Sequence, residues 1–115
     1  MNSPLFLIPL IAGPVFIITG WILLKYPPKK INLWYGYRTR NSMKNLEVWN
    51  FAQVYSAKEM MKAGFLLSVT SILGLFFKPS EFVSAFIAFG ILFFLIFIFI
   101  FRVEKAISKR LNALE

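Results

Sequence analysis

The side chains of this sequence that could do chemistry are concentrated in one polar stretch, residues 29–49, which reads KKINLWYGYRTRNSMKNLEVW. The stretch is basic and aromatic, whereas the sequence on both sides of it is strongly apolar. Such a segment can be a positively charged cytoplasmic loop with aromatic anchors, a site for anionic lipid headgroups, or a recognition element for a protein or peptide. Composition leaves these three interpretations open. Gly36 between two tyrosines, followed by Arg38 and Thr39, is nevertheless more patterned than a generic polybasic loop.

The sequence contains no residue grouping that is typical of a catalytic centre. Cys and His are both missing, which excludes thiol chemistry and the usual transition-metal sites, and we expect no cofactor. Glu47, Glu59 and Glu104 are the candidate proton acceptors, and none has a second carboxylate at an informative spacing. Neither a Gly-rich phosphate loop nor a nucleophile elbow is found. We therefore predict that the protein is not an enzyme.

The composition indicates an integral membrane protein rather than a soluble one. The 115 residues fit one domain at most, and 58% of them are hydrophobic, which leaves too little polar surface for a soluble globule. A net charge of +8 would suggest nucleic-acid binding in a soluble protein, whereas in a membrane protein it marks the loops kept in the cytoplasm. We therefore expect the lipid bilayer, and no nucleic acid, as a partner of this chain.

Three apolar runs predict three transmembrane helices, because ~20 apolar residues are needed to cross a ~30 Å hydrocarbon core. We predict an all-α fold in which an ordered cytoplasmic loop and an amphipathic helical segment at the membrane interface separate the first two spans. The predicted segments, in chain order, are the first span (5–24), the loop (25–44), the amphipathic segment (45–59), the second span (60–77), the third span (82–101) and a cytoplasmic tail (102–115).

Small and hydroxyl-bearing residues within the spans indicate helix packing more than a path for a solute. Gly13 and Gly20 share one face of the first span, and Gly64, Ser68 and Ser71 form a stripe on the second. Such stripes are usually seams at which membrane helices approach closely. A small transport protein, the main alternative to a binding protein, would need a polar path through the spans. The hydroxyls available to line such a path are those of Thr19, Ser68, Thr70, Ser71 and Ser84.

The distribution of Lys and Arg predicts the orientation of the spans. Residues 25–62 hold eight of the thirteen basic residues and the C-terminal tail holds four, whereas the turn at Lys78 holds one. Because loops rich in Lys and Arg stay in the cytoplasm, we predict an external N-terminus and a cytoplasmic C-terminus. Three short helices bury little surface, so we also expect a homo-oligomer.

The polar loop is predicted to be ordered, because its large apolar and aromatic side chains would be costly to leave in water. Arg38 is the expected keystone, since a planar guanidinium can bond several carbonyls and a carboxylate at once. Its candidate partners are Glu47 and Glu59. The simpler alternative for Glu59 is an ion pair at the membrane interface with Lys62 or Lys58.

The order of residues in this loop resembles the signature of the SdpI family, small bacterial membrane proteins named for immunity to a secreted peptide toxin. The matching pattern is K-I-N-x-x-Y-G-Y-R-T-x-x-S-M-K-N-x-x-x-W, preceded by two prolines. Members of this family contain a membrane unit of three helices, which agrees with the three apolar runs. With Glu47 and Glu59 added, the candidate binding residues are Asn32, Tyr35, Gly36, Tyr37, Arg38, Thr39, Ser42, Asn45, Glu47, Trp49 and Glu59.

The resemblance implies a function in immunity or sensing at the bacterial inner membrane. In the setting that gives the family its name, the membrane protein protects its producer from an antimicrobial peptide and also communicates with a cytoplasmic transcriptional regulator. A peptide toxin and a regulator protein are accordingly expected partners, and the basic loop adds anionic lipid to them. The alternatives are a small transport protein and a membrane-embedded enzyme acting on lipid or peptide.

Overall fold

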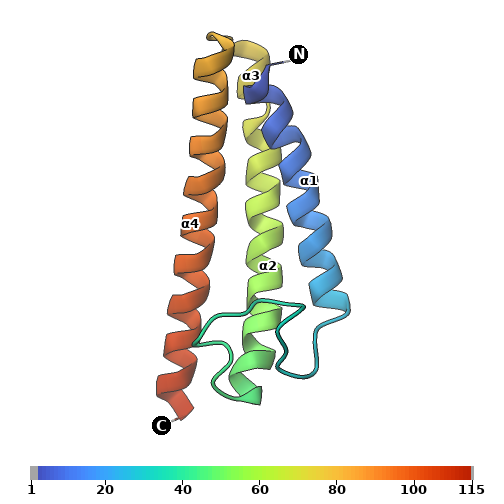
Figure 1. Ribbon diagram of the computed structural model, residues 1–115, viewed down its shortest axis with the longest axis vertical. Coiled ribbons are helices and arrows are strands. Elements are labelled where there is room, and N and C mark those ends of the chain that lie inside the picture. The colour runs from blue at the N-terminus through green and yellow to red at the C-terminus, as the bar shows by residue number, and fades with distance from the viewer. Residues whose placement is uncertain (1–2, 115) are drawn as a thin grey trace.

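The computed structural model describes residues 3–114, which form an elongated helical bundle of 52 × 25 × 20 Å (Figure 1). Its elements are α1 (Pro4–Lys25), α2 (Leu46–Thr70), the single turn α3 (Leu73–Phe76) and α4 (Glu81–Leu114). Three helices are long and apolar enough to cross a membrane, and the described residues contain no strand. The predicted all-α membrane fold is confirmed. Residue 115 of the predicted tail lies outside the described part of the chain.

The first helix begins and ends where the sequence provides boundary signals. The Ser3 hydroxyl caps α1 by accepting a hydrogen bond of 3.1 Å from the backbone N–H of Leu5, and Pro4 occupies the first helical position. The helix ends at Lys25, just before two prolines that disfavour helical backbone. At ~1.5 Å per residue its 22 residues span about 33 Å, which matches the thickness of the hydrocarbon core.

The seam between α1 and α2 is made of residues small enough for the two backbones to touch. A Cβ atom added to Gly13 would lie 2.8 Å from the Gly64 carbonyl oxygen, and one added to Gly64 would lie 2.6 Å from the Gly13 carbonyl oxygen. Gly20 is equally constrained, since its Cβ would lie 2.7 Å from the Ala57 carbonyl oxygen. Both small-residue faces predicted from the sequence are therefore packing seams, and they pack against each other.

The amphipathic segment and most of the second span form one continuous helix, α2. Asn45 caps its N-terminus, where the side-chain Oδ1 accepts a 2.8 Å hydrogen bond from the N–H of Val48. The helix is interrupted after Thr70, and α3 then carries the chain to the turn before α4. The first four turns of α2 therefore lie in line with the part of the helix that crosses the bilayer (Figure 1).

The predicted tail continues the third span without a break, so that α4 is 34 residues long, or about 51 Å. Its apolar half is largely exposed, as expected for a lipid-facing helix. The buried cluster of the bundle lies near the C-terminus of α4, where Val103 and Ile107 pack against Val48 and Ala52 of α2. The charged tail is therefore held against α2 by an apolar core of its own.

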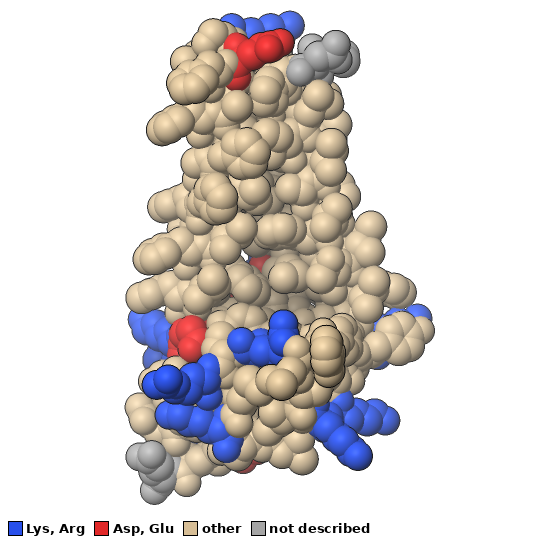
Figure 2. All heavy atoms as spheres, in the orientation of Figure 1, with Lys and Arg blue, Asp and Glu red and all other residues tan. Residues whose placement is uncertain are grey.

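The two ends of the bundle differ in the number of charged side chains that they carry. Figure 2 shows most Lys and Arg side chains around the end that carries the long loop and the C-terminus, with an apolar zone above it. We call this end, formed by residues 26–45, the start of α2 and the last turns of α4, the basic end. Three candidate spans of this composition fit a multi-pass membrane protein.

Candidate functional site

The candidate site is the loop of residues 26–45, called the motif loop, together with the helix surfaces that hold it. Figure 1 shows the loop leaving α1, passing across α2, reaching α4 and returning to the start of α2. Each part of the loop is held by side chains of the loop itself, of α2 or of α4.

The first part of the motif loop is folded by Asn32 and tied to α1 by Tyr35. The Asn32 Oδ1 atom accepts hydrogen bonds of 2.8 Å from the N–H groups of both Trp34 and Tyr35, and its amide nitrogen donates to the Lys30 carbonyl at 2.9 Å. Asn is suited to this turn because its short side chain can bond the backbone two and three residues away. The Tyr35 hydroxyl then donates to the Tyr26 carbonyl at 2.6 Å, directly after the end of α1.

The middle of the motif loop is held by α2 through two fully buried side chains. Gln53 pairs with both backbone groups of Tyr37: its Oε1 accepts from the N–H at 2.7 Å and its Nε2 donates to the carbonyl at 2.8 Å. Trp49 donates from Nε1 to the Pro28 carbonyl at 2.8 Å. Gly36 has a φ of +102°, and an added Cβ would lie 2.5 Å from Gln53 Oε1, so only glycine fits here.

The far side of the motif loop is held by a carboxylate of α4. Glu104 accepts three hydrogen bonds from the loop: from the Tyr37 hydroxyl at 2.7 Å, the Thr39 hydroxyl at 2.9 Å and the Asn41 amide at 3.1 Å. The Tyr37 ring also packs edge-on against Phe99, with 5.9 Å between ring centroids. Burial, followed by the hydrogen bond and charge of Glu104, raises the pKa of Tyr37 well above its ordinary value, so the hydroxyl stays a donor.

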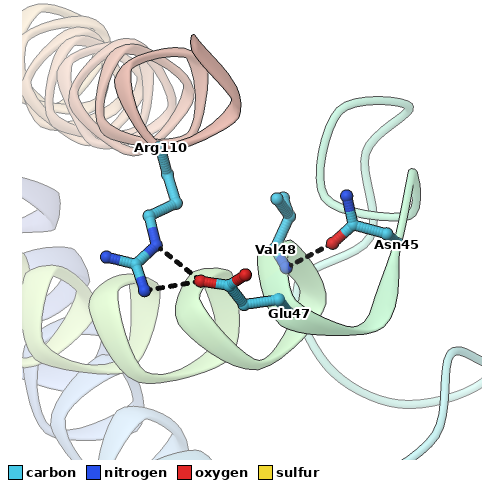
Figure 3. Close-up of polar contacts among 4 residues, drawn as sticks. All are labelled: Asn45, Glu47, Val48 and Arg110. Carbon is cyan, nitrogen blue, oxygen red and sulfur yellow. Dashed lines mark hydrogen bonds and ion pairs between the residues drawn. The ribbon is translucent and has the colours of Figure 1, made fainter. Parts of the chain in front are cut away.

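The last part of the motif loop is closed by a reciprocal pair. The Thr39 N–H donates to the Ser42 hydroxyl at 2.8 Å, and the Ser42 N–H donates to the Thr39 hydroxyl at 3.2 Å. Ser42 is fully buried and also donates to the Thr39 carbonyl at 3.0 Å. Asn45 then caps α2 (Figure 3). Ser42 and Asn45 therefore fix the shape of the loop and the start of α2.

Glu47 and Glu59 pair with arginines of α4. Arg110 donates to Glu47 from Nη2 at 2.6 Å and from Nε at 3.1 Å, across the surface of the basic end (Figure 3). Arg102 donates from Nε to the buried Glu59 at 2.7 Å, while the predicted partner Lys62 lies farther away, at 3.8 Å. Both acidic residues of α2 therefore join it to α4.

The predicted pairing of Arg38 with Glu47 or Glu59 is wrong. Its guanidinium donates from Nη1 to the Leu33 carbonyl, within the motif loop itself. The pairing fails because α4 continues as a helix beyond the third span and brings its own arginines alongside α2. The carboxylate that does hold the loop is Glu104, which the sequence suggested only as a possible proton acceptor.

Sequence reasoning missed the two residues that contact the motif loop most extensively, Gln53 and Glu104. Gln53 falls on the side of α2 opposite the apolar face, which hides its role. A signal for Glu104 does exist: Val103, Ile107 and Leu111 recur every four residues and predict a packed helical face with Glu104 at its edge. Glu104 is also the one acidic residue among the basic residues 102–110.

The site is a network of hydrogen bonds between the motif loop and the helices. Each of the three carboxylates discussed above has donors within hydrogen-bond distance. Within residues 3–114, no group of three or more metal-ligating side chains comes together. Such an arrangement can fix a loop, bind a ligand or transmit movement.

Comparison with known proteins places this site in a family. The family model described as the SdpI/YfhL protein family matches residues 29–101, which include most of the motif loop, all of α2 and α3, and the apolar part of α4. A Bacillus subtilis (strain 168) protein named "Uncharacterized protein YfhL" is 42% identical over 64 residues, which cover 56% of this chain and 58% of that relative. The match thus spans less than two thirds of the relative's own length. No solved structure matches.

Proposed function

This chain belongs to the SdpI/YfhL protein family, and we propose that it is a bacterial membrane protein of the immunity and sensor type. In this role it protects its cell against a membrane-active peptide toxin and reports to a cytoplasmic regulator protein. The proposal combines the family signature in the motif loop with the binding character of the site. The proposed location is the bacterial inner membrane.

One observation carries this proposal: the motif loop is fastened to all three membrane helices. Tyr35 ties it to the end of α1, where its hydroxyl lies 3.5 Å from the Ile22 carbonyl and 2.6 Å from that of the capping residue Tyr26. Gln53 ties it to α2 and Glu104 to α4. A ligand that shifts one helix within the bilayer therefore strains or releases these bonds. The loop is in this way suited to convey an event in the membrane to a partner at the basic end.

We further propose that the basic end faces the cytoplasm, which follows from its excess of Lys and Arg. Single cysteines at Trp34, Ser80 and Ser108 test this with an impermeant thiol reagent, because all three positions are exposed. Ser42 is unsuitable as a probe, since it is buried. External labelling should be confined to position 80 in intact cells. External labelling at position 34 or 108 would contradict the proposed orientation.

The hydroxyls of the spans support binding over transport, because four of the five bond backbone carbonyls of the same chain segment. Ser68 donates to the Gly64 carbonyl at 3.0 Å, and Thr70 and Ser71 donate to carbonyls three residues earlier at 2.6 Å. Ser84 donates to the Pro79 carbonyl at 3.4 Å. These groups leave few donors for a solute. Flux of a solute into proteoliposomes, lost on changing Thr70 or Ser71, would favour a transporter instead.

The direct test is expression in a bacterium that is sensitive to a membrane-active peptide, followed by challenge with that peptide. We expect the wild-type chain to raise survival. Glu104→Gln should abolish protection, because it weakens the attachment of the motif loop to α4. Glu47→Gln is the matched control, since the same change breaks only an exposed pair. At equal abundance in the membrane, failure of the wild type to protect, or equal effects of the two variants, would contradict the proposal.

A further inference from the structure

A cavity of about 460 Å³ lies beneath the motif loop, between the helices at the basic end. Residues 35–39 of the loop form its roof, and its walls come from α1, α2 and α4. The walls are mostly apolar and include Ile22, Met60 and Phe99. A volume of this size falls within the ~300–1,000 Å³ that is usual for sites of small molecules.

The cavity exists because α4 stands away from α1 at this level. Between Ala88 and Val103, α4 has no buried residue, whereas it is packed on either side of that stretch. The motif loop bridges the gap above. Ile22 and Ile100, on opposite walls, are 41% and 44% exposed, so the cavity can be reached from the surrounding lipid.

Among the polar side chains that line this mostly apolar cavity, Arg38 and Thr19 lie at different depths. Arg38 lies in the roof, and its guanidinium has one hydrogen-bond partner among the described residues, the Leu33 carbonyl. Thr19 lies in the wall with an exposed side chain, and its hydroxyl takes part in none of the side-chain hydrogen bonds found among residues 3–114. Thr19 is six residues before the end of α1, so it lies about 9 Å deeper along the helix. An unpaired hydroxyl at that depth is costly in hydrocarbon.

We propose that the cavity binds one anionic phospholipid from the leaflet at the basic end. The cavity has a cation in its roof, apolar walls that include Ile22 and Ile100 below it, and the Thr19 hydroxyl deeper along α1. A guanidinium binds phosphate through several N–H donors at once. The phosphate therefore lies at Arg38, the glycerol packs between Ile22 and Ile100, and the Thr19 hydroxyl donates to an ester oxygen, beyond which the acyl chain enters the surrounding lipid. This inference is independent of peptide protection.

This site differs from a general attraction between a basic loop and an anionic membrane. Lys29, Lys30 and Lys44 belong to the same motif loop but do not line the cavity. General attraction is worth about 1 kcal/mol for each basic residue, whichever residue is changed. A built site instead makes Arg38 count for more than its neighbours of equal charge.

The test is native mass spectrometry of the full chain in a neutral detergent, titrated with phosphatidylglycerol or with phosphatidylcholine of identical acyl chains. We expect one phosphatidylglycerol to bind about tenfold more tightly than phosphatidylcholine, a ratio that corresponds to ~1.4 kcal/mol. Arg38→Gln should remove most of this preference, while the matched change Lys29→Gln should leave it intact. Thr19→Leu, which loses a hydroxyl without breaking a bond within the chain, should weaken binding about threefold.

Four results would overturn this inference. Equal effects of Arg38→Gln and Lys29→Gln would indicate diffuse attraction, and equal binding of the two lipids by the wild type would remove the role of charge. Displacement of the lipid by inorganic phosphate would indicate a site for the headgroup alone. If Arg38→Gln lowers the unfolding temperature, Thr19→Leu decides the matter, and unchanged lipid binding by that variant would contradict the proposal.

Discussion

Replacing Glu104 with Gln should detach the motif loop from α4, and the structure allows the loss of stability to be worked out. Three loop donors, from Tyr37, Thr39 and Asn41, share this carboxylate. A hydrogen bond to a charged group contributes ~1.5–3 kcal/mol, against ~0.5–1.5 kcal/mol for a neutral pair. In the variant, the amide oxygen can still accept from two donors, but each bond loses about 1 kcal/mol of charge assistance. The amide nitrogen then faces the nitrogen of Asn41.

Because Glu104 is only partly buried, the lower end of these ranges applies, and we expect a loss of about 2 kcal/mol in the free energy of unfolding. The measurement is a denaturant titration of the detergent-solubilised protein, followed by circular dichroism. Glu47→Gln is the matched control. Its pair with Arg110 has side chains that are 49% and 46% exposed, so the cost should be below ~1 kcal/mol.

A double-mutant cycle identifies the contact responsible. Tyr37→Phe removes one donor, and combining it with Glu104→Gln should cost less than the sum of the two single changes by about 1 kcal/mol. If the two changes are additive, the bond between these residues does not stabilise the protein. If Glu104→Gln costs no more than Glu47→Gln, the attachment of the loop to α4 is energetically unimportant and the reasoning fails.

Two further predictions concern the helix seam and the response to pH. Gly13→Ala should destabilise the protein by about 1–3 kcal/mol, because its Cβ would press on the Gly64 carbonyl. Gly90→Ala is the control: its Cβ meets no atom within 4 Å, so this change should be neutral or stabilising by up to ~1 kcal/mol. Equal effects of the two changes in a denaturant titration would contradict the close packing of α1 against α2. The raised pKa of Tyr37 means that the folded protein keeps this proton when the unfolded chain loses it, so stability should fall as pH rises above the ordinary pKa of 10.0. Tyr37→Phe should lose this component of the fall, and an identical pH profile for wild type and variant would argue against it.

The helices were predictable because their causes are local or come from the bilayer. The lengths of apolar runs follow from bilayer thickness, and the cap at Ser3 and the face shared by Gly13 and Gly20 follow from helical geometry. The partner of the loop was not predictable in this way. Tyr37 and Glu104 are 67 residues apart in sequence, and no spacing rule connects them. Their contact depends on how far α4 continues as a helix and which face it turns to α2.

The same limit explains the wrong pairing of Arg38. Within a loop, a guanidinium can satisfy its donors with the nearest carbonyl, as it does with Leu33. The acidic residues of α2 had competing arginines, at 102 and 110, on a helical segment that we predicted only as a cytoplasmic tail. The prediction that Glu59 forms an ion pair was therefore correct, and Lys62 does lie near it. Its main partner, Arg102, was missed.

Because α4 is one unbroken helix, its apolar part and its charged C-terminal part move together as a rigid body. A helix is stiff along its axis, so its apolar half and its last 13 residues, about 20 Å long, tilt and rotate as one rod. The other two long helices are locked backbone to backbone at Gly13 and Gly64 and act as the frame against which this rod can pivot. Glu104 lies in the charged C-terminal part of α4, just beyond the apolar segment. A small displacement of the rod within the lipid is therefore converted into a pull on Tyr37, at the centre of the motif loop.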